Sequence, residues 1–330
     1  MTKTLTSRLV WGLTSILGIL VVNFTILHMV PGDPLQAIIG EYPAPPAYIE
    51  QIKRDFGLDQ PIYIQLLHYI ANIATGNLGF SFANRADVLS LILERARFTL
   101  MLVLPALAIS AIVGICLALT GARKAGSAYD SMITAVSLFG YSVPVFWFGQ
   151  VLLLVFAVQF GLLPAAGIVS MRAPSTGFGL VADVAWHMVL PLFSVTFFFV
   201  AEIARVARAG AVDALAQDYI LTARAKGAKK RQVLFRHVLP NAMIPVVTVI
   251  GYNLGHALTA TLMVETVFAW PGLGTLFISS VATRDYPVLM GVLLFASVLV
   301  ILSNIVTDFL YSALDPRVRD KARDGDGRDK

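Results

Sequence analysis

Long runs of apolar residues with almost no acidic or basic side chains constrain the fold of this chain most strongly. An α-helix of about 20 apolar residues crosses the ~30 Å hydrocarbon core of a bilayer. Only 14% of the 330 residues are charged, whereas soluble domains carry roughly 25%. The sequence therefore predicts an all-α polytopic membrane protein with six transmembrane helices, over residues 9–30, 98–120, 132–160, 185–204, 242–264 and 288–310.

The charges beside these runs predict their orientation. Lys3 and Arg8 precede the first run, and basic residues stay on the cytoplasmic side of membrane proteins. Six spans then place both termini in the cytoplasm, and the short external loops contain Arg172 and Arg284 as basic residues. The first run is long enough to span and has no small-residue cleavage site after it, so it is interpreted as a retained helix.

The predicted spans divide the chain into four parts. Residues 1–30 form the cytoplasmic N-terminus and the first span. Residues 31–97 are expected to form a small external subdomain, because turn signals alternate there with short helical patterns. Residues 98–312 form the core with the other five spans, and residues 313–330 form a charged cytoplasmic tail. Pro144 lies inside the third run, which predicts a kink or a break there.

Several kinds of site have no counterpart in the sequence. In the nearest approach to a phosphate-binding loop, residues 121–127, no lysine follows the second glycine. The single cysteine, Cys116, excludes a disulfide or a cysteine-based metal site within one chain, and the histidines lack metal-ligand spacing. The sequence therefore predicts a chain that is not an enzyme, with no catalytic, cofactor or metal site and no ATP hydrolysis of its own.

Acidic residues in the predicted spans are few. Glu202, Glu265 and Asp308 all lie near predicted helix ends, whereas carriers driven by an ion gradient use acids within the membrane as relays. This pattern favours a pore-forming subunit that is driven by a separate protein. A self-contained secondary carrier or channel is the alternative.

Residues 205–241 form the longest basic segment between two apolar runs. Asp218 is expected to cap a helix over residues 219–226, and Gly227 is expected to end that helix in the left-handed conformation. A second short helix over residues 229–238 would place three apolar residues on one side, and Pro240 would begin the next span. The three residues are Val233, Leu234 and Val238.

These two short helices predict a rigid elbow close to the membrane. Such an elbow could fit a groove on a partner protein. The basic residues of the segment also follow from topology and from contact with anionic lipid. Both interpretations hold together, with the apolar side and the turn as the candidates for docking.

The elbow resembles the cytoplasmic coupling motif in permeases of ATP-binding-cassette (ABC) importers. In that motif, Glu-Ala-Ala is followed after three residues by Gly, and after nine more by Ile-x-Leu-Pro. The residues at matching spacings are Ala223, Gly227, Leu239 and Pro240. The residues that depart from the general pattern are Leu221, Thr222 and His237. Residues 217–227 are similar instead to the peptide-type version, and they read Gln-Asp-Tyr-Ile-Leu-Thr-Ala-Arg-Ala-Lys-Gly.

Further segments resemble the same peptide-type family along nearly the whole chain. They are Val30-Pro-Gly-Asp-Pro34, Phe56-Gly-Leu-Asp-Gln-Pro61, Leu78-Gly-Phe-Ser81, Pro144-Val-Phe-Trp147, Leu163-Pro-Ala165, Glu265-Thr-Val-Phe-Ala-Trp-Pro-Gly-Leu-Gly274, Arg284-Asp-Tyr-Pro287 and Leu314-Asp-Pro-Arg317. The resemblance is to the first of the two permease subunits in dipeptide and oligopeptide importers.

The resemblance implies the partners and the docking residues. It implies a homologous second permease, two separate ATPase subunits that use ATP and Mg²⁺, an external solute-binding protein, the bacterial cytoplasmic (inner) membrane, and no nucleic acid. The solute stays open among dipeptides, oligopeptides, glutathione, nickel chelates, opines and sugars. The elbow residues implied to dock on an ATPase are Asp218, Ala223, Arg224, Ala225, Lys226, Gly227, Leu234, Leu239 and Pro240.

Other polar residues have two interpretations each. Asn253 and His256 in the fifth run could line a pore or make hydrogen bonds between helices. Glu202 and Arg205, three residues apart, are expected to form a local ion pair. Asp33 in the first external turn could brace that turn or meet a delivered solute.

Small and aromatic residues are expected to have structural roles. Gly251 and Gly255 fit the small-x-x-x-small pattern of close helix contact, which favours packing within one chain over a subunit interface. Trp147 and Trp270 are expected to anchor at the membrane interface.

Overall fold

The structure, a computed structural model, describes residues 2–29, 45–55, 60–81, 83–171 and 176–314. These residues are mostly helical, which confirms the predicted all-α class. Asp33 and the predicted tail beyond residue 314 lie outside the described residues. The helices are α1 (Thr2–Met29), α3 (Pro46–Asp55), α4 (Ile62–Ala74), α5 (Val88–Arg123), α6 (Ala128–Ser142), α7 (Val145–Leu152), α8 (Phe178–Leu215), α9 (Asp218–Ala225), α10 (Lys230–Val233), α11 (Leu239–Gly255), α12 (Ala257–Val267), α13 (Leu273–Ala282) and α14 (Tyr286–Leu314).

A small hairpin that the sequence did not predict precedes α5. Its strands are β1 (Phe80–Ser81) and β2 (Ala86–Asp87), which pair antiparallel. Asp87 then caps α5, because its Oδ2 accepts a hydrogen bond from the Ser90 amide at 3.0 Å. The Ser81 hydroxyl donates to Asp285 Oδ2 at 2.5 Å. The hairpin is therefore fixed to the turn between α13 and α14.

Among the described residues, four helices are long and apolar enough to cross a membrane: α5, α8, residues Lys230–Gly255, and α14. A fifth candidate joins α6 to residues Val145–Gln159, where α7 continues into a π-helical segment, and it is bent by 99°. The bend follows Ser142 and confirms the break predicted at Pro144. In α1, Val10–Ile26 form a shorter apolar stretch. This set is compatible with six spans.

The predicted fifth span is not one helix. It breaks at His256, between α11 and α12, and α13 follows after a tight turn over residues 268–272. Trp270 of this turn is fully buried, and its indole Nε1 donates to the Phe98 carbonyl oxygen at 2.9 Å. The prediction that Trp270 anchors at the membrane interface is therefore wrong, because the turn folds back onto α5.

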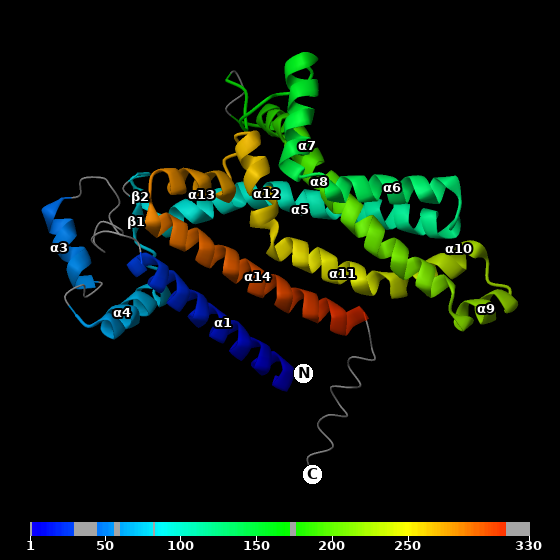
Figure 1. Cartoon of the computed structure of the whole chain (residues 1–330), viewed down its shortest axis with the longest axis horizontal. Coiled ribbons are helices and arrows are strands. Elements are labelled where there is room, and N and C mark those ends of the chain that lie inside the picture. The colour runs from blue at the N-terminus through cyan, green and yellow to red at the C-terminus, as the bar shows by residue number, and fades with distance from the viewer. Residues whose placement is uncertain (1, 30–44, 56–59, 82, 172–175, 315–330) are drawn as a thin grey trace, which may run out of the picture.

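Helix α8 lies at the centre of the bundle and packs against α5, α6 and α11. Helix α14 packs against α11 and α1 (Figure 1). At the α11–α14 contact, a Cβ added to Gly251 would overlap Thr307, and one added to Gly255 would lie 3.2 Å from the Cα of Val300. The two glycines therefore permit close helix packing within one chain, as predicted.

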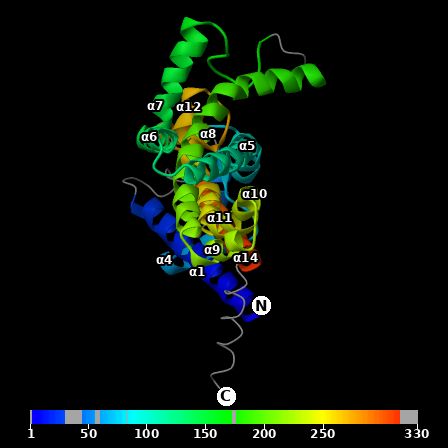
Figure 2. The same ribbon diagram turned by 90° about the vertical axis from the view of Figure 1, so that its right-hand side faces the viewer.

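The two ends of the bundle carry different elements. Helices α3 and α4 and the hairpin lie at one end, and α9 and α10 lie at the opposite end (Figure 1). Figure 2 shows α7 and the beginning of α8 projecting away from the other helices. The elbow is thus far from the segment that was predicted to be external.

Candidate functional site

The first limb of the elbow is α9, which follows α8 after a turn of two residues. Gln217 has extended backbone angles and takes the N-cap position, while Asp218 is the first residue of the helix. No side chain makes a capping hydrogen bond there. The predicted cap by Asp218 is therefore wrong by one residue, because the turn is closed earlier by backbone hydrogen bonds. The Asp218 carboxylate still lies in the first helical turn, where the helix dipole stabilises a negative charge.

The end of α9 is a Schellman motif built on Gly227. This residue has the left-handed conformation that the sequence predicted. Gly227 has φ +81°. The Ala228 amide donates to the Ala223 carbonyl oxygen at 3.1 Å, and the Gly227 amide donates to the Arg224 carbonyl oxygen at 2.9 Å. This pair of hydrogen bonds satisfies carbonyls at the helix end and reverses the chain sharply. The turn is therefore defined by the backbone.

The second limb differs from its prediction. Residues Lys230–Gly255 form one continuous helix instead of a short helix followed by a span that begins at Pro240. A π-helical turn, Leu234–Val238, lies inside it. Proline has no N–H to donate a hydrogen bond to the preceding helical turn, and its ring crowds the carbonyl group of that turn. The wider π-helical turn before Pro240 makes room for the proline ring. The elbow is consequently joined to α11 without a loop.

The inner side of the elbow packs against the ends of two long helices. Ile220 and Val238 are fully buried, and Ala223 and Leu234 are also buried. Leu239 packs at the margin of the same cluster. The residues that meet this side from α5 and α8 are Leu119, Ala122, Ala211 and Ala214. Ala223 and Leu234 thus fix the elbow to the bundle and do not form its outer surface.

The outer side of the elbow is basic, and its exposed large side chains are Tyr219, Leu221 and Phe235. Leu221 is 63% exposed and Phe235 is 53% exposed. Other exposed residues of the elbow are Asp218, Arg224, Ala225, Lys226, Gly227, Lys229, Lys230, Arg231, Arg236 and Pro240. A shallow hollow is lined by Lys229, Arg231, Gln232, Phe235 and Arg236. The sequence did not predict Leu221 and Phe235 as surface residues, because their exposure depends on how the two limbs of the elbow pack.

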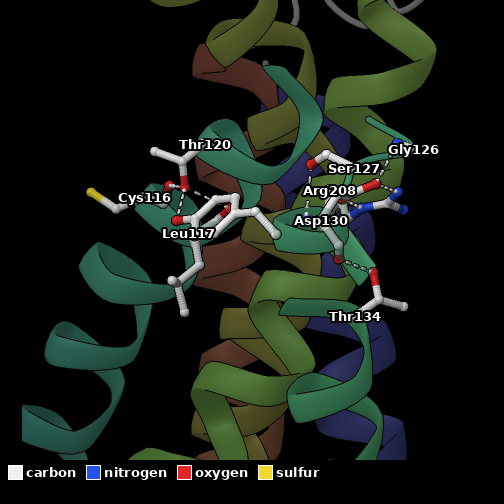
Figure 3. A network of polar contacts seen from close by, with 9 residues as sticks. Cys116, Leu117, Thr120, Gly126, Ser127, Asp130, Thr134 and Arg208 are labelled. Carbon is white, nitrogen blue, oxygen red and sulfur yellow. Dashed lines mark hydrogen bonds and ion pairs between the residues drawn. The ribbon is translucent and has the colours of Figure 1, made fainter. Parts of the chain in front are cut away.

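The structure also contains an ion pair at the base of the elbow that the sequence did not predict. Arg208 of α8 donates to Asp130 of α6 from Nε to Oδ1 at 2.6 Å and from its terminal nitrogen to Oδ2 at 2.7 Å (Figure 3). Asp130 also accepts from the Gly126 amide at 3.0 Å. This bidentate arrangement is geometrically specific. It fixes the turn between α5 and α6 to α8, about two helical turns before the elbow.

We expect loss of this ion pair to loosen the base of the elbow. Asp130→Asn or Arg208→Gln should lower the thermal unfolding midpoint of the purified protein by a few degrees, because each leaves a charged group without its partner. The double variant should be at least as stable as the less stable of the two single variants, because both substitutions remove the same interaction. Arg123→Gln, an exposed residue of the same turn, is the matched control. Additive losses in the double variant would contradict direct coupling.

The polar residues of the fifth span have structural contacts. Asn253 is buried, and its Nδ2 donates to Glu202 Oε2 at 2.7 Å. His256 is exposed and stacks on Tyr252, with ring centroids 4.1 Å apart. The predicted ion pair of Glu202 is wrong, because the guanidinium of Arg205 lies 4.2 Å from the centre of the Tyr141 ring instead. In the described part of the chain, no group of three His, Cys, Asp or Glu residues could hold a metal ion.

Two parts of the sequence match protein families of transport-system membrane components. Residues 110–320 match the binding-protein-dependent transport system inner membrane component, and residues 1–103 match the N-terminal part of such components. The dipeptide transport system permease protein DppB of Escherichia coli K12 is 37% identical over 331 residues, which cover 95% of this chain and 98% of the relative. The oligopeptide transport system permease protein AppB of Bacillus subtilis is 36% identical, with 94% and 97% covered.

A further relative and a solved structure agree with these matches. The glutathione transport system permease protein GsiC of Escherichia coli O6:H1 is 38% identical over 314 residues, which cover 95% of this chain and 98% of the relative. A chain from the inward-facing MetNI methionine ABC transporter has the same fold, with a TM-score of 0.55 and 18% identity, over 68% of this chain and 96% of that one. The chain belongs to the family of binding-protein-dependent transport system inner membrane components.

Proposed function

We propose that this chain is one of two membrane-spanning subunits of an ATP-driven importer for dipeptides or other small peptides. Its relatives in several bacteria are permease proteins of dipeptide, oligopeptide and glutathione transport systems. A homologous second permease completes the pathway, and a solute-binding protein delivers the peptide from outside. The family membership disfavours the alternative of a self-contained carrier or channel.

The outer side of the elbow is the proposed contact for a separate ATPase subunit. The observation that carries this proposal is the exposure of Leu221 and Phe235 among basic side chains. Exposed apolar residues beside charged ones are typical of a surface that another protein covers. The buried inner side and the backbone-defined turn at Gly227 make the limb rigid. In this proposal ATP and Mg²⁺ are bound by two ATPase subunits and not by this chain.

The proposed orientation places the elbow and both termini in the cytoplasm. Residues 31–97 then face the outside, where they can meet the solute-binding protein. The separation of α3 and α4 from α9 and α10, at opposite ends of the bundle, supports this arrangement (Figure 1). Asp33 belongs to the proposed external part.

The experiment that tests this function first is recovery of the complex. We expect the tagged chain, extracted in mild detergent, to carry with it a second permease, an ATPase and a solute-binding protein, identified by mass spectrometry. The reconstituted assembly should take up alanylalanine only with ATP and the binding protein. Recovery of this chain alone, with uptake driven by an ion gradient, would replace the proposal with the carrier hypothesis.

The apolar pair on the elbow should be required for assembly. We expect Leu221→Ala and Phe235→Ala each to weaken binding of the ATPase about tenfold or more, because anchor residues at interfaces contribute ~2 kcal/mol or more. The measurement is ATPase recovered per permease in the pull-down. Leu93→Ala is the matched control, since Leu93 is 55% exposed on α5. Equal ATPase recovery in all variants would exclude this contact.

A further inference from the structure

An apolar groove runs between α1, α4 and α14. Helix α1 lies alongside α14, and it also contacts α4 (Figure 1). The groove has a volume of about 460 Å³, and every residue that lines it is apolar or glycine. The residues that form its three sides include Leu13, Leu17 and Leu20 of α1, Ile73 of α4, and Leu294 and Val298 of α14.

Two sides of this groove belong to apolar membrane helices. The α14 side lies in a helix that is long and apolar enough to cross a membrane, and the α1 side lies within the apolar stretch Val10–Ile26. Leu13 is 61% exposed and Leu17 is 41% exposed, so the groove is open at the surface beside α1. Around apolar segments of this kind the solvent is lipid hydrocarbon. The open side of the groove therefore meets the acyl chains of the bilayer.

The size and the chemistry of the groove restrict what can fill it. Among the described residues, those that line the groove include no acidic or basic side chain, so a charged solute would lose its hydration there without gaining a partner. A helix of another protein is about 10–12 Å across with its side chains, which is too wide for a groove of this volume. A single acyl chain is apolar and narrow, and it meets both requirements.

The groove adjoins a small cavity that contains polar groups. This cavity has a volume of about 40 Å³ and shares Ile73 and Leu294 with the groove. Asn72, Asn77 and Tyr286 also line the cavity, and they supply neutral hydrogen-bonding groups. Asn77 precedes the hairpin and Tyr286 begins α14, so the cavity lies towards the end of the bundle where the hairpin is. Tyrosine is enriched where membrane helices meet the headgroup region, and an ester group of a lipid would lie at such a position.

We propose that the groove binds one acyl chain of a phospholipid, with the ester end of that chain beside Asn72, Asn77 and Tyr286. The bound chain would complete the packing of α1, whose contacts with the bundle are mainly to α14 and α4. Each methylene group that enters the groove adds to the affinity, so binding should become tighter with chain length until the groove is full. The inference concerns a lipid and does not depend on which solute is transported.

The test measures lipid binding to the full-length chain in mild detergent by native mass spectrometry. The probe is palmitoyl-oleoyl phosphatidylethanolamine, and it is compared with dihexanoyl phosphatidylethanolamine, whose chains are too short to fill the groove. We expect the wild type to bind the long-chain lipid at least tenfold more tightly, because more methylene groups are buried. Leu17→Trp should weaken binding of the long-chain lipid about tenfold, since the larger side chain takes the place of about two methylene groups.

The matched control is Val21→Trp, because Val21 is 44% exposed on the same helix and does not line the groove. This variant should bind the long-chain lipid as the wild type does. Leu13→Trp, at the more exposed rim, is a second variant in case Leu17→Trp lowers the midpoint of thermal unfolding, and it should also weaken binding.

Two results would overturn the inference. Equal affinity for the long-chain and short-chain lipids, or equal affinity of the wild type, Leu17→Trp and Val21→Trp for the long-chain lipid, would show that lipid covers only the general apolar surface. Loss of a co-purifying second permease from Leu17→Trp, with unchanged lipid binding, would assign the groove to a protein partner instead. Neither result would bear on ATP-driven uptake, so the proposed function is tested separately.

Discussion

Replacing Gly227 by valine should uncouple ATP hydrolysis from uptake. The residue has φ +81°, where a β-branched side chain is strained by about 1–2 kcal/mol. A Cβ at this position would meet nothing within 4 Å, so the effect is confined to the turn and does not arise from a clash. We expect ATP-driven uptake to fall about tenfold, because strain of this size shifts the population of the docked turn by about that factor. The assay is uptake and ATP hydrolysis by the reconstituted complex.

Asparagine at the same position provides the matched control. Asparagine tolerates the left-handed conformation better than other residues with a Cβ, so Gly227→Asn should retain most of the uptake. The amount of each variant in the membrane should equal that of the wild type. Uptake by Gly227→Val at the wild-type rate would rule out a role for this turn in coupling.

Removing the Glu265 carboxylate should destabilise the protein more than any other single change proposed. Glu265 is fully buried, and its oxygens accept from Thr99 Oγ1 at 2.7 Å and from the Gly274 amide at 2.7 Å. Glu265→Ala leaves these buried donors unpaired, at about 1–3 kcal/mol each. We expect the midpoint of thermal unfolding in detergent to fall by roughly 10 °C.

An exposed glutamate is the matched control for Glu265. Glu94 of α5 lies 3.5 Å from Arg97, and both side chains are more than half exposed. Such surface pairs contribute ~1 kcal/mol or less, so Glu94→Ala should change the midpoint little. Glu265→Gln, which keeps one acceptor oxygen, should give an intermediate loss. Equal midpoints for Glu265→Ala and Glu94→Ala would show that the buried network does not stabilise the fold.

Local rules predicted the features that depend on neighbouring residues. The apolar runs located the spans, Pro144 located the break after α6, and Gly227 located the end of α9. The helix cap predicted at Asp218 was wrong by one residue, because Gln217 takes the N-cap position and no side chain makes a capping hydrogen bond there.

Features that depend on distant residues could not be predicted from the sequence. The fold of α12 and α13 depends on Glu265 reaching Thr99, which is 166 positions away in the chain. Arg208 finds Asp130 across 78 positions. Ala223 and Leu234 were predicted for a docking surface, but the helices that cover them come from other parts of the chain. Family resemblance located the elbow, and only the structure shows which of its sides is free.

The continuous helix from Lys230 to Gly255 has a mechanical consequence. Its 26 residues span about 39 Å, so a tilt of about 10° at the elbow would move the far end by about 7 Å. The π-helical turn, Leu234–Val238, lies near the end of this helix that adjoins the elbow, about which the helix would tilt. The helix ends at the break at His256, so α11 could tilt while α12 and α13 stay packed against α5. A small displacement at the proposed ATPase contact would thus be enlarged at the far end of α11, where Asn253 lies.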